Sequence, residues 1–99
     1  MAKLRYEIEY AQEAVDDVNA LPAYAQRRIL DGIDQHLRYQ PTKVSRTRIK
    51  QMVQPFWSQF RLRIEEFRVY YDVDEDSHVV NVLRILSKER SQTPEESPS

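Results

Sequence analysis

The chain has 99 residues, 40% of them hydrophobic and 31% charged, with a formal net charge of −1 at pH 7. This length predicts a single domain that buries about two-thirds of its unfolded surface and has no room for an internal cofactor cavity. The absence of cysteine excludes a disulfide framework, a thiolate metal site and a cysteine nucleophile. No apolar run approaches the roughly 20 residues of a membrane span, and the N-terminus lacks the apolar segment of a signal peptide. We therefore expect a cytoplasmic protein that does not contact a membrane.

The N-terminal half of the sequence changes from the periodicity of a strand to that of helices. Alternating apolar residues predict a first strand over residues 4–10. Apolar residues then recur at helical spacing, which predicts a helix over residues 11–21. A second helix should run from Pro22 to about Tyr39, and Pro41 prevents it from continuing. Two helices joined so closely form a helical hairpin that can cover one face of a small sheet.

The second half of the chain has the patterns of strands. A short strand is expected over residues 48–53. Residues 60–64 and 67–73 alternate between apolar and polar side chains on either side of a reversal at residues 65–66, as in an antiparallel hairpin. A last strand over residues 78–86 is apolar on both faces, which is typical of a central strand. Regular alternation there places one set of side chains on each face: Val79, Asn81, Leu83 and Ile85 against Val80, Val82, Arg84 and Leu86.

These elements predict an α+β domain over residues 1–90. Their order is β-α-α-β-β-β with a terminal strand at residues 79–85, forming a small antiparallel sheet with the two-helix hairpin on one face. Residues 91–99 contain two prolines and no aliphatic residue that could anchor them. We expect this segment to be a disordered or loose tail.

The hairpin predicted at residues 60–73 has a core face and a charged face. Because side chains in a strand repeat with period 2, the charged face carries Arg61, Arg63, Arg68 and Tyr70. Guanidinium groups are planar and permanently charged, so a cluster of them is well suited to hold phosphate. Residues 43–71 contain only two acidic residues against seven basic ones, which are Lys43, Arg46, Arg48, Lys50, Arg61, Arg63 and Arg68. Such a patch can bind a polyanion, although charges that merely solvate a small surface would give the same pattern.

Three further side chains have a structural and a functional interpretation. His36 and His78 lie far apart in the predicted fold and have no metal ligand at a suitable spacing, so we expect surface histidines and no metal or cofactor. Trp57 precedes the arginine strand. We expect it in the core at the sheet edge, and the alternative is a platform on which a nucleobase stacks.

The order of elements and two segments resemble the RelE/ParE toxin superfamily of bacterial type II toxin–antitoxin modules. The segment LRIEEFRVYYDV at residues 62–73 is similar to the family's arginine-containing strand, and VNVLRILSKER at residues 80–90 resembles its last strand and the basic end that follows. The resemblance covers roughly residues 3–90. It implies a partner antitoxin encoded next to the toxin, whose acidic residues would mask the arginines.

In the RelE branch, the resemblance implies metal-independent cleavage of mRNA on the ribosome. The ribose 2′-hydroxyl attacks the adjacent phosphate, a base takes its proton, cations hold the developing charge and an acid protonates the leaving oxygen. By position, Arg68 matches the arginine that stabilises the phosphate, and Arg61 falls where a lysine often serves as base or charge stabiliser. Lys88 and Arg90 match the basic pair after the last strand. Further candidates for phosphate or RNA binding are Arg46, Arg48, Lys50, Arg63 and Arg84.

The sequence departs from this pattern at two places. Residues 91–95, SQTPE, contain neither the tyrosine nor the histidine that often follows the basic pair, and Gln59 replaces a second common lysine. Tyr70 shares a face with Arg68 and is the candidate for the missing acid, although packing under a loop or against an antitoxin segment also accounts for it.

Two alternatives therefore stand beside mRNA cleavage. The ParE branch shares the fold and inhibits DNA gyrase without a nuclease centre, and the missing tyrosine fits that branch as well. An inactive antitoxin-binding module is the third possibility. We expect an mRNA-cleaving toxin with the ribosome and mRNA as partners, and DNA gyrase as the partner in the alternative.

Overall fold

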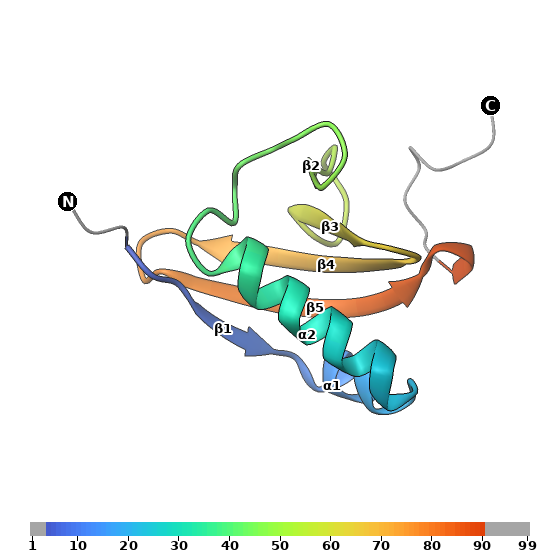
Figure 1. Cartoon of the computed structure of the whole chain (residues 1–99). Coiled ribbons are helices and arrows are strands. Elements are labelled where there is room, and N and C mark those ends of the chain that lie inside the picture. The colour runs from blue at the N-terminus through green and yellow to red at the C-terminus, as the bar shows by residue number, and fades with distance from the viewer. Residues whose placement is uncertain (1–3, 91–99) are drawn as a thin grey trace.

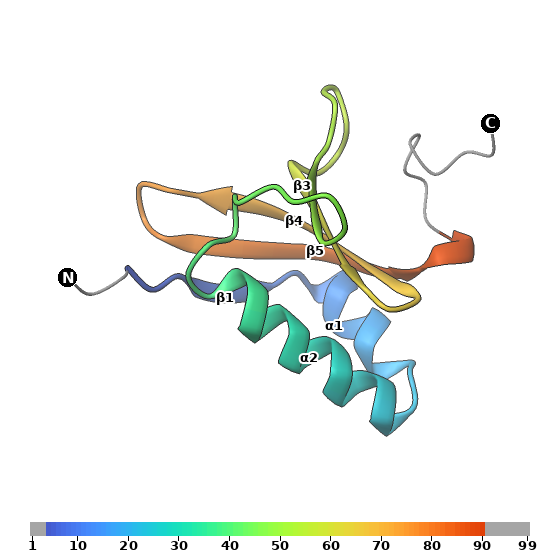
Figure 2. The ribbon, with the colours of Figure 1, turned by 45° about the horizontal axis from the view of Figure 1, so that its top comes forward.

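Two helices lie on one side of a five-stranded sheet in the computed structural model, which describes residues 4–90 (Figure 1). The elements are β1 (Glu7–Tyr10), α1 (Gln12–Asn19), α2 (Ala23–Leu37), β2 (Ile49–Gln51), β3 (Phe60–Ile64), β4 (Phe67–Asp74), β5 (Val79–Ser87) and a 3-10 helix, η1 (Lys88–Arg90). The predicted α+β class and the helical hairpin on one face are confirmed (Figure 2). The tail predicted at residues 91–99 lies outside the described residues. Neither α1 nor α2 is long and apolar enough to cross a membrane.

The sheet is mixed, which corrects the expectation of an antiparallel sheet. Its strand order is β1-β5-β4-β3-β2. The four strands that follow the helices form an antiparallel meander, whereas β1 pairs with β5 in parallel, with Glu7 opposite Val79. The reason is topological. The helical hairpin carries the chain across the sheet to the far edge, and the meander then returns until its last strand lies beside the first.

The core lies between the helices and the sheet. On α2, Ala25, Ile29, Ile33 and Leu37 recur every four residues and are all buried, so they form one apolar stripe. The core cluster combines this stripe with α1 and the facing side of the sheet: Ala14, Val18, Ile29, Ile33, Leu37, Ile49, Phe60, Leu62, Ile64, Val69, Tyr71, Val80, Val82 and Ile85.

The single glycine of the chain lets α2 approach the sheet closely. A Cβ atom on Gly32 would lie 2.7 Å from Cδ1 of Ile64 on β3. A glycine inside a helix lowers helix stability by about 1 kcal/mol relative to alanine. At this position the close packing of α2 on β3 accounts for the choice of residue.

A β-bulge interrupts the alternation of β5. Tyr70 pairs with Arg84 but Tyr71 pairs with Val82, which leaves Leu83 as an extra residue. The prediction of regular alternation is therefore wrong beyond Leu83, because Ile85 lies in the core and Arg84 lies with Tyr70 on the opposite face. The bulge thus keeps Arg84 out of the core, and its guanidinium reaches Asp17 on α1 instead.

The hydroxyl of Tyr71 ties β4 to the loop after α2. Tyr71 is fully buried, and its Oη donates a hydrogen bond of 2.6 Å to the carbonyl oxygen of Pro41, which is also buried. Burial raises the pKa of Tyr71 far above its ordinary value, so the hydroxyl stays protonated and acts as the donor.

Tyr71→Phe should therefore lower the free energy of unfolding by about 1–3 kcal/mol, because the ring is kept while a buried carbonyl loses its donor. Urea unfolding at pH 7 measures the change. Tyr39→Phe is the matched control. Tyr39 is exposed, so its hydroxyl can bond to water and its removal leaves no buried group without a partner. Equal stability of the two variants would contradict a structural role for the Tyr71 hydroxyl.

Candidate functional site: a basic pocket on β2 and β3

The charged face predicted from alternation exists. Arg61 lies directly opposite Tyr70 and Arg63 directly opposite Arg68 in the β3–β4 ladder. Directly paired residues project from the same face of a sheet, so these four side chains share the face that points away from the helices. Lys50 on β2 lies opposite Arg61 and extends the same face by one strand.

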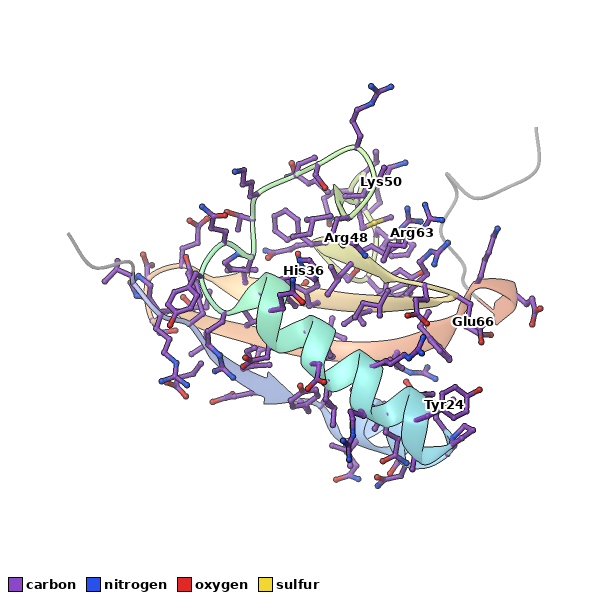
Figure 3. The ribbon with its side chains drawn as sticks, viewed as in Figure 1. Tyr24, His36, Arg48, Lys50, Arg63 and Glu66 are labelled. Carbon is purple, nitrogen blue, oxygen red and sulfur yellow. The ribbon has the colours of Figure 1, made fainter. Side chains whose placement is uncertain are left out.

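Five cationic side chains meet in a pocket of about 280 Å³ at the β2 edge of this face. The pocket, called the basic pocket below, is lined by Val44, Ser45, Arg46, Thr47, Arg48, Ile49, Lys50, Arg61 and Arg63. None of these lining residues carries a carboxylate. Figure 3 shows Lys50 on β2, Arg63 on β3 and Arg48, the residue before β2, projecting near one another. Such an arrangement can hold phosphate groups through charge-assisted hydrogen bonds.

The turn before β2 fixes the wall of the basic pocket. The Ser45 Oγ accepts hydrogen bonds from the backbone N–H groups of Arg48 and Ile49, at 3.0 and 3.2 Å. Arg48 is then joined to Arg63 twice: its Nη1 donates to the Arg63 carbonyl at 3.0 Å, and its carbonyl accepts the Arg63 N–H at 2.8 Å. Residues 45–48 are therefore held against β3, and the Arg48 guanidinium is positioned before any ligand binds.

Arg68 and Tyr70 are not open to solvent, which corrects the expectation of a continuous exposed face. Arg68 is only 3% exposed, and its Nη1 donates to the carbonyls of Glu65 and Phe67 at 3.0 and 3.1 Å. Its guanidinium thus braces the turn between β3 and β4. Tyr70 is fully buried beneath the loop between β2 and β3, where Trp57 lies against it. Of the two interpretations of Tyr70, packing under a loop agrees with its position in the structure.

Arg84 is engaged by a carboxylate of the protein itself. Its Nε and Nη2 donate to the two carboxylate oxygens of Asp17 on α1, at 2.8 and 3.0 Å, and one of these oxygens also accepts the N–H of Ile85 at 2.9 Å. Hydrogen bonding to Asp17 raises the pKa of Arg84. Its charge is thus matched by Asp17 within the protein, and a role for Arg84 as a phosphate ligand stays a prediction.

The two basic residues after β5 are separate from the basic pocket as far as they are described. Lys88 is exposed, and its backbone N–H donates to the Glu66 carbonyl at 2.7 Å. Arg90 ends η1, and its side chain lies outside the described part of the structure. A role for this pair in catalysis stays a prediction.

His36, which was expected to be a surface histidine, is partly buried and lines a second pocket beside the basic one. This pocket of about 330 Å³ is formed by Gln35, His36, Tyr39, Gln40, Lys43, Ser45, Arg48 and Ile49, so it shares Ser45, Arg48 and Ile49 with the basic pocket. Figure 3 shows His36 near the end of α2. Desolvation and the nearby Arg48 charge lower the pKa of His36, so its imidazole is neutral at pH 7. Sequence reasoning missed it because only the fold brings α2 next to residues 43–49.

Comparison with known proteins gives a consistent assignment. Residues 8–92 match the family model described as the ParE toxin of the type II toxin–antitoxin system parDE. The fold is similar to a toxin–antitoxin complex, RelBE2 of Mycobacterium tuberculosis, with a TM-score of 0.75 at 20% identity over 87% of this chain and 94% of that chain. It is also similar to the RelE–RelB complex of Pyrococcus horikoshii, with a TM-score of 0.70 at 22% identity over 89% and 100% of the two chains.

The isolated Escherichia coli RelE toxin gives a TM-score of 0.65 at 15% identity over 92% of this chain and 93% of that chain. No curated protein matches the sequence. At sequence identities of 15–22%, the structural similarities establish only the fold. The family assignment rests on the family model, which matches residues 8–92. The resemblance inferred from residues 62–73 and 80–90 is thus confirmed. The chain belongs to the ParE toxin family within the RelE/ParE superfamily, and it is the toxin of a type II toxin–antitoxin module.

Proposed function

We propose that this toxin inhibits translation by acting on mRNA at the ribosome, and that the basic pocket binds the RNA backbone. The observation that carries the proposal is the gathering of Arg46, Arg48, Lys50, Arg61 and Arg63 around one opening whose described lining has no carboxylate. Phosphate contacts supply most of the affinity of proteins for nucleic acid. Five neighbouring cations gain much less from contact with a neutral surface than from contact with phosphates.

The pocket also suits the charge that develops during RNA cleavage. When a ribose 2′-hydroxyl attacks the adjacent phosphate, negative charge accumulates on the phosphorane oxygens, and positioned cations lower the energy of that state. Lys50 and Arg61 lie opposite each other on neighbouring strands, with Arg63 further along the same face. We assign the phosphate-stabilising role to these three residues. Arg68, bound to two backbone carbonyls, then acts by holding the β3–β4 turn.

Inhibition of DNA gyrase is the second candidate, and two observations favour it. The matching family model is that of ParE toxins, and the burial of Tyr70 withdraws the side chain nominated as general acid. A toxin that only binds and blocks gyrase needs neither an acid nor a base.

The proposed partner in both cases is an antitoxin with an acidic segment. Several of the matched structures, among them those from Mycobacterium tuberculosis and Pyrococcus horikoshii, are toxin–antitoxin complexes. For this chain, carboxylates of the antitoxin would compete with RNA for the basic pocket, and opposite charges would speed their association.

Inducible expression in bacteria, with separate assays of protein synthesis, mRNA integrity and DNA supercoiling, tests the proposal. We expect amino-acid incorporation to fall within minutes and mRNA to be cut, while plasmid supercoiling persists. Relaxed or broken DNA with intact mRNA would replace the proposal by gyrase inhibition. Normal growth with a folded toxin, as shown by circular dichroism, would instead indicate the inactive antitoxin-binding module.

A further inference from the structure

An exposed tryptophan lies on a buried tyrosine beside the basic pocket. Trp57 belongs to the loop between β2 and β3 and is 42% exposed, whereas Tyr70 beneath it is fully buried. The two ring centroids are 4.6 Å apart, and Phe56 stacks on Trp57 from the side at 4.9 Å with an interplanar angle of 27°. The indole is thus supported by two other rings while much of its surface faces solvent.

The loop that presents Trp57 is held in place at several points. The N–H of Met52 donates to the carbonyl of Gln59 at 2.8 Å and closes the loop. Inside it, the Gln54 side-chain amide donates to the Ser58 carbonyl at 3.3 Å, and the Ser58 hydroxyl donates to the Phe60 carbonyl at 3.2 Å. Met52 and Ser58 are both buried. A ring held in this way loses little conformational entropy when a ligand stacks on it.

The Trp57 ring lies close to the basic pocket along the sheet. Tyr70, on which Trp57 lies, is directly opposite Arg61 in the β3–β4 ladder, and Arg61 is directly opposite Lys50. Both cations line the basic pocket. An aromatic surface next to a phosphate-binding groove is the combination by which proteins bind single-stranded nucleic acid, since every base has a face that can stack.

We infer that Trp57 is a stacking platform for an unpaired nucleobase of a single-stranded RNA whose phosphates lie in the basic pocket. This inference rests on the proposed function, because it requires that the basic pocket takes an RNA backbone. A peptide segment of an antitoxin could also cover an exposed indole. The nucleic acid is favoured because a base can stack on the exposed ring while its phosphates reach the five cations of the adjoining pocket.

The test uses the intrinsic fluorescence of the full chain, since Trp57 is its only tryptophan. The toxin is titrated with a single-stranded RNA hexamer and, separately, with inorganic polyphosphate of similar charge, which has no bases. We expect the RNA to quench the fluorescence strongly and polyphosphate to leave it nearly unchanged.

Trp57→Leu should weaken RNA binding, measured by anisotropy of a labelled hexamer, by about 5- to 150-fold and leave polyphosphate binding unaltered. Trp57→Phe should recover part of the loss. Tyr24→Leu, which removes an exposed ring on α2, is the control.

The outcomes separate the platform from the proposed function. Unchanged RNA affinity in Trp57→Leu, with translation still inhibited, would overturn the platform and leave the function in place. Loss of RNA and polyphosphate binding together would indicate a folding defect in that variant. The titration of the wild-type toxin then decides: RNA binding that does not quench the fluorescence of Trp57 overturns the platform. Reduced antitoxin binding with unchanged RNA binding would identify Trp57 as a protein contact and would also overturn it. A wild-type toxin that binds neither probe would remove the proposed function itself.

Discussion

Reversing two charges of the basic pocket should abolish growth arrest. In the double variant Arg46→Glu, Arg63→Glu, two of the five cations around the pocket become anions. Each phosphate contact of this kind contributes about 1.5–3 kcal/mol, so we expect RNA affinity and translation inhibition to fall at least 100-fold. Because fewer counterions are displaced, the slope of log affinity against log salt concentration should shrink by roughly 1.4 for a single-stranded ligand. Filter binding at several salt concentrations and a cell-free translation assay measure both effects.

The matched control is Arg5→Glu, Arg27→Glu, which changes the net charge equally at exposed positions outside the pocket. This variant should retain most of the activity, because the five cations around the basic pocket are unchanged. Arg46 and Arg63 are also exposed, and Arg63 faces another arginine across the ladder, so a glutamate there should not unfold the sheet. If the control variant loses as much activity as the pocket variant, the effect would come from total charge, and the basic pocket would lose its assigned role.

Replacing Asp17 with alanine should have the largest effect on stability. The Asp17 carboxylate accepts two hydrogen bonds from Arg84 and one from the Ile85 N–H, and its side chain is only 16% exposed. Asp17→Ala leaves a partly buried guanidinium and a backbone donor without this acceptor. We expect the free energy of unfolding to fall by about 3 kcal/mol. For a domain of this size the melting temperature would drop by roughly 12–24 °C.

Differential scanning calorimetry of Asp17→Ala and Asp16→Ala provides the comparison. Asp16 is the exposed neighbour on α1, and its carboxylate accepts a hydrogen bond from the Gln12 side chain. Its loss should change stability by less than about 0.5 kcal/mol. Similar melting temperatures for the two variants would mean that the ion pair with Arg84 contributes little to the attachment of α1 to β5.

The parts of the fold that follow from local periodicity were predictable. Residues 60–64 and 67–73 alternate so regularly that their pairing and the shared face of Arg61 and Arg63 follow from the period of a strand. The parallel partner of β1 did not follow, since nothing within residues 7–10 encodes which edge they join. The bulge at Leu83 could not be predicted either. Because β5 has apolar residues on both faces, shifting the strand by one residue still places apolar side chains on the core face.

The site was predictable to the extent that its cations lie on regular strands. Lys50, Arg61 and Arg63 meet where alternation places them, and Arg46 and Arg48 join them through the turn at Ser45. The burial of Tyr70 depends on a loop without periodicity that folds back over the sheet. The pairing of Asp17 with Arg84 joins residues from opposite ends of the chain. Contacts of this range arise only when the elements assemble.

The parallel pairing of β1 with β5 makes the order of synthesis matter. Because the first strand finds its neighbour only when residues 79–82 are available, a growing chain on the ribosome cannot complete its sheet until nearly all of the described domain has emerged. The long-range contact makes folding slow relative to a helical protein of similar length. The sheet that carries the basic pocket is therefore completed only near the end of synthesis of the described domain.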